Sequence, residues 1–118
     1  MAGEGAPFKV FRCPPGLRIT LEGSVEARCP FTGAPDFYEL SIEYISGGLC
    51  VEAVSFSGWL DSFRGREISQ EDLTAELINT IKRVLEPRSL CVRLTGDHGR
   101  VTITTEACGG DEILPQPL

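Results

Sequence analysis

Residues 17–29 read "LRITLEGSVEARC", and apolar and polar side chains alternate along this stretch. A period of two is typical of a β-strand that buries one face and exposes the other. Gly23 interrupts the apolar series, and we expect a β-bulge there. The stretch therefore predicts a long, half-buried strand that ends with the thiol of Cys29 on its apolar face.

Three later segments repeat the alternation. Residues 38–44 follow closely, and residues 90–94 and 101–105 come near the end of the chain. The sequence "GDHG" (96–99) between the last two predicts their hairpin turn. The chain therefore carries two predicted pairs of strands.

Two segments between these pairs have helical spacing. A helix over roughly residues 50–63 is predicted from the spacing of Phe56, Trp59, Leu60 and Phe63. A second helix is predicted after Ser69 and Asp72, which resemble a capping box, and it stops at Pro87.

The predicted order is ββααββ, which places the chain in the α+β class. Two helices can cover one apolar face of a four-stranded antiparallel sheet. Such an open sheet has two edges, so we expect subunits to associate laterally into a barrel. Residues 1–16 and 109–118 are rich in Gly and Pro. We expect an irregular N-terminal arm (1–16), a catalytic domain (17–108) and a C-terminal tail (109–118).

Composition excludes several classes of protein. A chain of 118 residues with 42% hydrophobic and 24% charged residues is an ordinary single globular domain. It contains no apolar run of about 18 residues and no export signal, so we expect no membrane association and a cytoplasmic location. The net charge of −6 predicts no general affinity for nucleic acid, so any phosphate contacts must be local.

Cysteine usage bears on metals and disulfides. Five cysteines without a CxxC pair argue against a disulfide framework and against a cysteine-rich zinc site. With His98 as the single imidazole, we expect no metal. We expect Cys13, Cys50, Cys91 and Cys108 to be mostly buried, small apolar residues.

The loop "CPFTGAPDF" (29–37) has two interpretations. Cys29 and Asp36 are either a core residue and a turn residue, or a nucleophile and a proton donor held at fixed separation. Pro30 and Pro35 restrict the loop, so both groups could be preorganised.

This loop, "CVEAVSFSGWLDSFRG" (50–65) and "ISQED" (68–72) together resemble the QueF nitrile reductases of queuosine biosynthesis. The resemblance spans roughly residues 25–108 and keeps the ββααββ order. It implies the tunnelling fold (T-fold), in which subunits form ring-shaped barrels. These are typically pentamers stacked in pairs into decamers, with active sites between subunits.

The resemblance also implies roles for individual residues. Cys29 matches the nucleophile that adds to the nitrile of 7-cyano-7-deazaguanine, and Asp36 matches the proton donor. Glu71 matches the glutamate that binds the guanine-like edge of the base, although a first-turn glutamate also complements the helix dipole. Glu52 and Val51 match residues that line the base pocket.

Two kinds of departure distinguish this chain from the reductases. Gln70 stands where they carry a histidine, and Val54 and Ser57 stand where they carry two lysines for the NADPH phosphates. No GxGxxG motif replaces those cations, so we expect no nicotinamide cofactor.

This pattern resembles the archaeal QueF-like amidinotransferases. In that branch the cysteine that Cys29 matches forms a thioimide with 7-cyano-7-deazaguanine in tRNA. Ammonia attacks this thioimide, and the product is archaeosine. Two alternatives are an NADPH-dependent 7-cyano-7-deazaguanine reductase and a catalytically inactive base- or tRNA-binding module. Retention of both Cys29 and Asp36 speaks against the inactive module.

Overall fold

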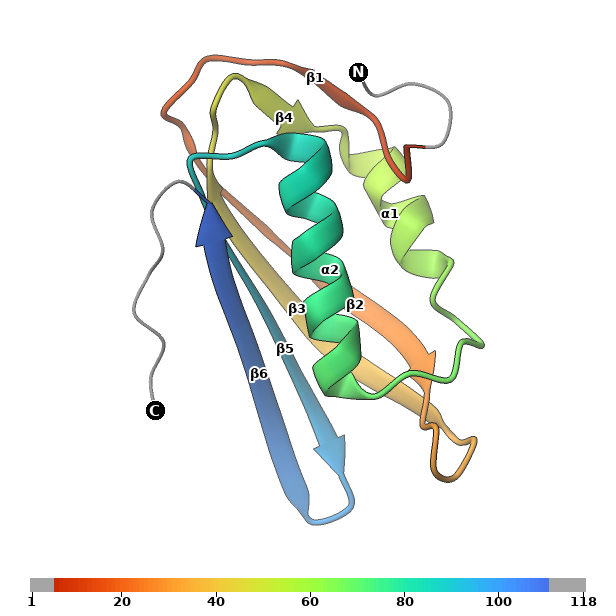
Figure 1. The fold of residues 1–118 in the computed structure, drawn as a ribbon. Helices are drawn as coiled ribbons and strands as arrows, with labels where there is room; N and C mark the ends of the chain where they lie inside the picture. The colour runs from red at the N-terminus through yellow and green to blue at the C-terminus, as the bar shows by residue number, and fades with distance from the viewer. Residues whose placement is uncertain (1–5, 111–118) are drawn as a thin grey trace.

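A computed structural model describes residues 6–110 of the chain. Four antiparallel strands form the main sheet in the order β2-β3-β5-β6, and two helices lie on one face of it (Figure 1). The strands are β2 (Arg18–Arg28), β3 (Pro35–Ile45), β5 (Ser89–His98) and β6 (Val101–Gly110). The helices are α1 (Ala53–Asp61) and α2 (Gln70–Leu85). The predicted α+β arrangement is confirmed.

The long β2–β3 hairpin has an unbroken register. Arg18 pairs with Ile45 at one end and Arg28 with Pro35 at the other, and Gly23 pairs with Leu40 between them. The prediction of a bulge at Gly23 is therefore wrong. Without a bulge, alternate side chains of β2 keep to one face from the first residue to the last.

The second helix begins where the sequence predicts. The Ser69 side chain accepts a hydrogen bond from the Asp72 N–H, which caps α2. The first helix is shorter than the predicted 50–63, because Leu49–Val51 form a further strand, β4, and Glu52 caps the helix instead. Helical spacing of the later aromatic residues could not reveal this short strand.

The hairpin between β5 and β6 turns later than predicted. Gly96, Asp97 and His98 are paired residues of β5, and the turn lies at positions 99–100. Gly96 is needed inside the strand for a different reason. A Cβ on it would lie 2.5 Å from Cδ1 of Tyr38, so the absence of a side chain makes room for that ring.

Part of the predicted arm belongs to the folded domain. Strand β1 (Val10–Arg12) pairs with β4, and the buried ring of Phe8 lies 5.0 Å from that of Phe56. Residues 109–110 end β6 rather than starting the tail. The rest of the predicted tail (111–118) and the first five residues of the arm lie outside the described residues.

Four of the five cysteines form two disulfides. Cys13 in the arm joins Cys50 in β4, and Cys91 joins Cys108 directly across the β5–β6 ladder. The expectation of no disulfide framework is wrong, because an odd total shows only that at least one thiol is left over. The free thiol is Cys29.

The main core lies between the sheet and the helices. Its largest fully buried members include Tyr38, Tyr44, Leu77 and Leu94. Among the described residues, no helix is long and apolar enough to cross a membrane.

Candidate functional site

The β2–β3 register brings the thiol and the carboxylate to one face of the sheet. Asp36 pairs with Ala27, and opposite residues of an antiparallel pair point to the same face. Cys29 lies two residues beyond Ala27, and its N–H still bonds to the Ala34 carbonyl at 2.8 Å. Cys29 and Asp36 are therefore diagonal neighbours on the face that the helices cover, and such neighbours have Cβ atoms roughly 7–8 Å apart.

Hydrogen bonds close the loop between these residues. The Gly33 N–H donates to the Cys29 carbonyl at 2.8 Å, and the Arg28 guanidinium donates to the Gly33 carbonyl at 2.7 Å. Gly33 has φ of +75°, a conformation that favours glycine. The loop is thus held from both strands, which supports the preorganisation expected from its two prolines.

The surroundings of Cys29 favour its thiolate. The pKa of the thiol is lowered by a hydrogen bond from the Thr32 side chain and by the backbone N–H groups of Phe31 and Thr32. Burial and the charge of Asp36 act in the opposite direction but are smaller effects. Thiolate is the nucleophilic form of cysteine, so these contacts favour the form in which Cys29 would act as a nucleophile.

The carboxylate has a buried neighbour. The Tyr38 hydroxyl donates to Oδ2 of Asp36 at 3.2 Å. The pKa of Tyr38 is raised by burial first, then by the charge and hydrogen bond of Asp36, and then by the charges of Cys29 and Glu71. Charges at Asp36, Cys29 and Glu71 thus all disfavour ionisation of this one phenol.

The start of α2 lies beside the end of β2. The Ile68 N–H donates to the Arg28 carbonyl at 3.0 Å, which ties the approach to α2 to the residue before Cys29. Glu71 in the first turn is exposed and available to a ligand. The β2–β3 loop, the first turn of α2 and the β5–β6 hairpin all lie at the same end of the sheet (Figure 1).

Gln70, which stands where the reductases carry a histidine, is buried in the protomer. Its side chain is 2% exposed, and its amide nitrogen donates to the carbonyls of Leu94 and Ile103 at 3.1 and 2.9 Å. Its oxygen lies 2.8 Å from Nε2 of His98. In one protomer, Gln70 therefore joins α2 to β5 and β6.

Glu52 and Val51 lie at the other end of the sheet. The N–H of buried Val51 donates to the Tyr44 hydroxyl, and Tyr44 is eight residues along β3 from Asp36. At about 3.3 Å per residue, the two ends are roughly 26 Å apart. Both oxygens of Glu52 accept backbone N–H groups of α1, from Ser55 and Val54, which lowers the pKa of Glu52. One protomer thus unites Cys29, Asp36 and Glu71 but leaves Glu52 and Val51 apart from them.

Sequence reasoning missed two residues of this site. Thr32 is part of the quoted loop motif, so its position was available as a signal. Tyr38 reads simply as a core residue of an alternating strand, because its hydroxyl contact depends on where β5 leaves room for the ring.

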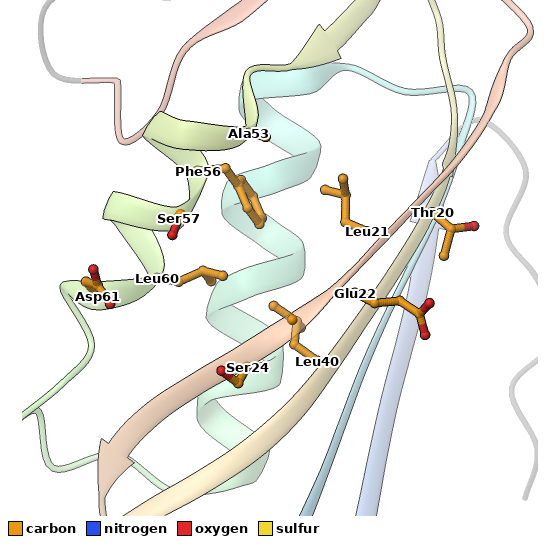
Figure 2. Close-up of a pocket in the computed structure, with 11 residues that line it drawn as sticks. Thr20, Leu21, Glu22, Ser24, Leu40, Ala53, Phe56, Ser57, Leu60 and Asp61 are labelled. Carbon is orange, nitrogen blue, oxygen red and sulfur yellow. The ribbon is translucent and has the colours of Figure 1, made fainter.

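The described residues also form a groove away from the thiol (Figure 2). Its volume is about 550 Å³, and it lies between α1 and the edge strand β2. Phe56 and Leu60 point from α1 toward Leu21 and Leu40, whereas Glu22 points away (Figure 2). Neither Cys29 nor Asp36 lines the groove, so it is separate from the reactive groups.

The surface near the thiol contains exposed aromatic residues. Phe31 in the loop is 87% exposed and Phe37 beside Asp36 is 68% exposed. Within residues 6–110, no three His, Cys, Asp or Glu side chains gather as a metal site would need. On α1, Val54 and Ser57 are both exposed and carry no charge.

Comparisons with known proteins give consistent relatives. A family model described as "QueF-like protein" matches residues 35–112. An archaeosine synthase of Pyrobaculum calidifontis is 35% identical over 80 residues, which are 68% of this chain and 72% of that protein. An NADPH-dependent 7-cyano-7-deazaguanine reductase of Campylobacter lari is 34% identical over 91 residues, which are 75% of this chain and 69% of that protein. The crystal structure of the archaeosine synthase QueF-Like in the apo form superposes with a TM-score of 0.77 at 29% identity, covering 84% of this chain and 97% of that chain.

Proposed function

The chain belongs to the QueF-like protein family, and on that basis we propose that it is an archaeosine synthase. The reaction converts 7-cyano-7-deazaguanine in tRNA to archaeosine, with ammonia as the nitrogen donor. One observation carries the proposal: the thiol of Cys29 has a lowered pKa and shares a sheet face with Asp36. Since the proposed substrate is a tRNA, we also propose a cytoplasmic location.

The first half of the mechanism forms a covalent adduct. The Cys29 thiolate attacks the nitrile carbon, and a C–S bond forms as one π bond of the nitrile breaks. The nitrogen gains negative charge and takes a proton from the carboxyl group of Asp36. The products are a thioimide on Cys29 and the carboxylate of Asp36.

The second half releases the product. Ammonia adds to the thioimide carbon and gives a proton to the Asp36 carboxylate. The tetrahedral intermediate then collapses, the C–S bond breaks, and its electron pair returns to the sulfur of Cys29. The net change adds ammonia across the nitrile to give a formamidine, and both residues regain their starting states.

We assign base recognition to Glu71. Its carboxylate can accept two hydrogen bonds from the ring N–H and the exocyclic amine of a guanine-like edge. Val51 and Glu52 lie roughly 26 Å from Asp36 in the same protomer, so we propose that a neighbouring subunit supplies them to the base pocket. Gln70 takes part by fixing the start of α2 rather than by contacting the base, since its amide is used within the protomer.

The open sheet supports a proposal for the assembly of subunits. β2 and β6 are its two edges, and we propose that they join in successive subunits to form a barrel of five, stacked in pairs into a decamer. The groove beside β2 (Figure 2) then lies next to the subunit junction. Exposed Phe31 adds apolar surface at the loop that carries Cys29, whereas Phe37 points to the opposite face of the sheet from Asp36.

The reductase alternative is less well supported by α1. Dinucleotide phosphates need cations or strong donors, whereas Val54 is 80% exposed and Ser57 carries a hydroxyl. Ammonia is small and neutral and needs only access to the Cys29 adduct. The chemistry of these side chains therefore favours the amidinotransferase.

One experiment tests the proposal. The protein is incubated with tRNA that carries 7-cyano-7-deazaguanine, together with ammonium and NADPH. We expect archaeosine in the digested tRNA, unchanged NADPH absorbance, and a mass adduct on Cys29 when ammonium is omitted. Cys29→Ala serves as the negative control. Stoichiometric NADPH oxidation with a primary amine product would establish the reductase instead, and a wild-type protein without adduct or product would establish the inactive module.

A further inference from the structure

We propose that Tyr38 is a positioning residue that fixes the carboxyl of Asp36, so that its exchangeable proton is carried on Oδ1. This inference rests on the proposed function, because it concerns the proton that Asp36 transfers. It assigns a task to a buried side chain that the reaction does not otherwise use.

The contact between the two residues is local and directional. Tyr38 and Asp36 are two positions apart on β3, so their side chains lie on the same face. The phenol is 2% exposed, and its hydroxyl donates to Oδ2 of Asp36 at 3.2 Å. A carboxyl oxygen that accepts this bond is the poorer place for a proton, so the proton of the acid form belongs on Oδ1.

Two neighbours hold the ring in place. Gly96 on β5 lies against it so closely that a Cβ would come within 2.5 Å of Cδ1 and 2.7 Å of Cε1. The ring of His98 lies 6.1 Å from that of Tyr38 between centroids. His98 is itself fixed, since its Nε2–H donates to the oxygen of Gln70 while the amide nitrogen of Gln70 donates to Leu94 and Ile103.

The phenol stays a donor throughout the working range of the enzyme. Its pKa is raised, chiefly by burial and then by Asp36. The titratable groups that face it are Asp36 from β3, Cys29 from the loop, Glu71 from α2 and His98 from β5. Asp36 makes the direct hydrogen bond to the phenol. A change in the charge of Asp36 should therefore affect Tyr38 more than a change at the other three groups.

The first test compares two buried tyrosines. Tyr38→Phe keeps the ring and removes the hydroxyl, and Tyr44→Phe does the same at the other end of β3. With nitrile-bearing tRNA and no ammonium, and with each protein compared at the maximum of its own pH profile, we expect Tyr38→Phe to form the Cys29 adduct roughly 10-fold more slowly than wild type. Its tRNA affinity should stay within about twofold, because the lost bond is not to the ligand. Because the Tyr44 hydroxyl accepts from the N–H of Val51, Tyr44→Phe controls for the pH profile, which should match that of wild type, and not for the absolute rate.

The pH dependence separates positioning from packing. A donor to Oδ2 favours the carboxylate, so its removal should move the fall in adduct rate to higher pH in Tyr38→Phe but not in Tyr44→Phe. Equal rates and superimposable pH profiles for Tyr38→Phe and wild type would overturn the assignment. A wild-type protein that forms no adduct would instead refute the proposed function.

A second test needs neither substrate nor a change at Tyr38. The chain has two tyrosines, so 3-fluorotyrosine labelling gives two fluorine NMR resonances, assigned with Tyr44→Phe. We expect the Tyr38 resonance to shift across the carboxyl titration range and to lose that shift in Asp36→Asn. A resonance that does not titrate, or that titrates equally in Asp36→Asn, contradicts the inference whether or not the protein is an archaeosine synthase.

Discussion

Asp36 lies directly opposite Ala27 in the β2–β3 ladder. This pairing fixes the reactive face, because Cys29 follows Ala27 by two residues and shares its side of the sheet. A slip of one residue would turn Asp36 to the other face. The unbroken register through Gly23 therefore matters to the chemistry as well as to the fold.

Thr32→Val should raise the pKa of the Cys29 thiol, because the Thr32 hydroxyl is the first cause of its lowering. The rate of alkylation by iodoacetamide, followed against pH, should reach half of its maximum at higher pH than in wild type. Thr95→Val, on β5 rather than in the β2–β3 loop, is the matched control. Identical alkylation profiles for all three proteins would show that Thr32 does not lower the pKa of Cys29.

Asp36→Asn should act on the same thiol with the opposite sign. The charge of Asp36 raises the pKa of Cys29, so its removal should move the alkylation profile to lower pH. Adduct formation with the nitrile should nevertheless slow by about 100-fold or more, since an amide is not a proton donor of comparable strength. Faster alkylation with slower adduct formation is the expected signature, and a parallel loss of both would argue for misfolding.

Glu71→Ala should weaken binding of the free base 7-cyano-7-deazaguanine. A charged acceptor of hydrogen bonds contributes about 1.5–3 kcal/mol, which corresponds to roughly 10- to 150-fold in Kd. Asp72→Ala removes the neighbouring first-turn carboxylate and is the control for the helix dipole. Calorimetric titration measures both variants in a Cys29→Ala background. Equal losses of affinity in the two variants would show that Glu71 stabilises the helix and does not bind the base.

Glu52→Gln should lower Tm near neutral pH, because Glu52 caps α1 with both carboxylate oxygens. The pKa of Glu52 is lowered in the folded state, so its contribution is present above the ordinary carboxyl pKa of about 4.3. This contribution to stability is lost as pH falls through the pKa that Glu52 has in the folded protein. The difference in Tm between variant and wild type should therefore disappear in acid, and a difference that persists unchanged there would contradict the charge-based cap.

The two disulfides should stabilise the fold unequally. The bonded cysteines are 37 and 17 residues apart, which the loop-entropy relation converts to about 4 and 3 kcal/mol respectively. Denaturant unfolding of Cys13→Ser with Cys50→Ser, and of Cys91→Ser with Cys108→Ser, measures each contribution. A thiol assay on the unfolded, unreduced wild type should find the single sulfhydryl of Cys29. Five titratable thiols would show that neither bond forms.

Much of the fold could be predicted because the sheet signal is strong. Alternation from Leu17 to Cys29 fixes the inward face of β2. Ser69 fixes the start of α2, because its side chain accepts a hydrogen bond from the N–H of Asp72, three residues later. Both signals are local. The strand β4 is also local, but it exists because β1 pairs with it from about forty residues away, and no spacing within Leu49–Val51 reports that contact.

The candidate catalytic loop was predictable in part. Its motif identifies Cys29 and Asp36 as candidates, and the register then brings them together. The roles of Thr32 and Tyr38 depend on where a hydroxyl ends after folding, which sequence alternation does not encode. The capping role of Glu52 was missed for a related reason, since glutamate is not among the residues usually found at that position.

The two open edges of the main sheet belong to different strands, β2 and β6. Joining β6 of one copy to β2 of the next is a head-to-tail contact, and each addition leaves one edge of each kind exposed. Growth by this contact stops when the accumulated rotation closes a ring, and otherwise it continues as a filament. The twist of these four strands therefore decides between a finite particle and a fibre, so a substitution that flattens the sheet could polymerise the protein without touching its active site.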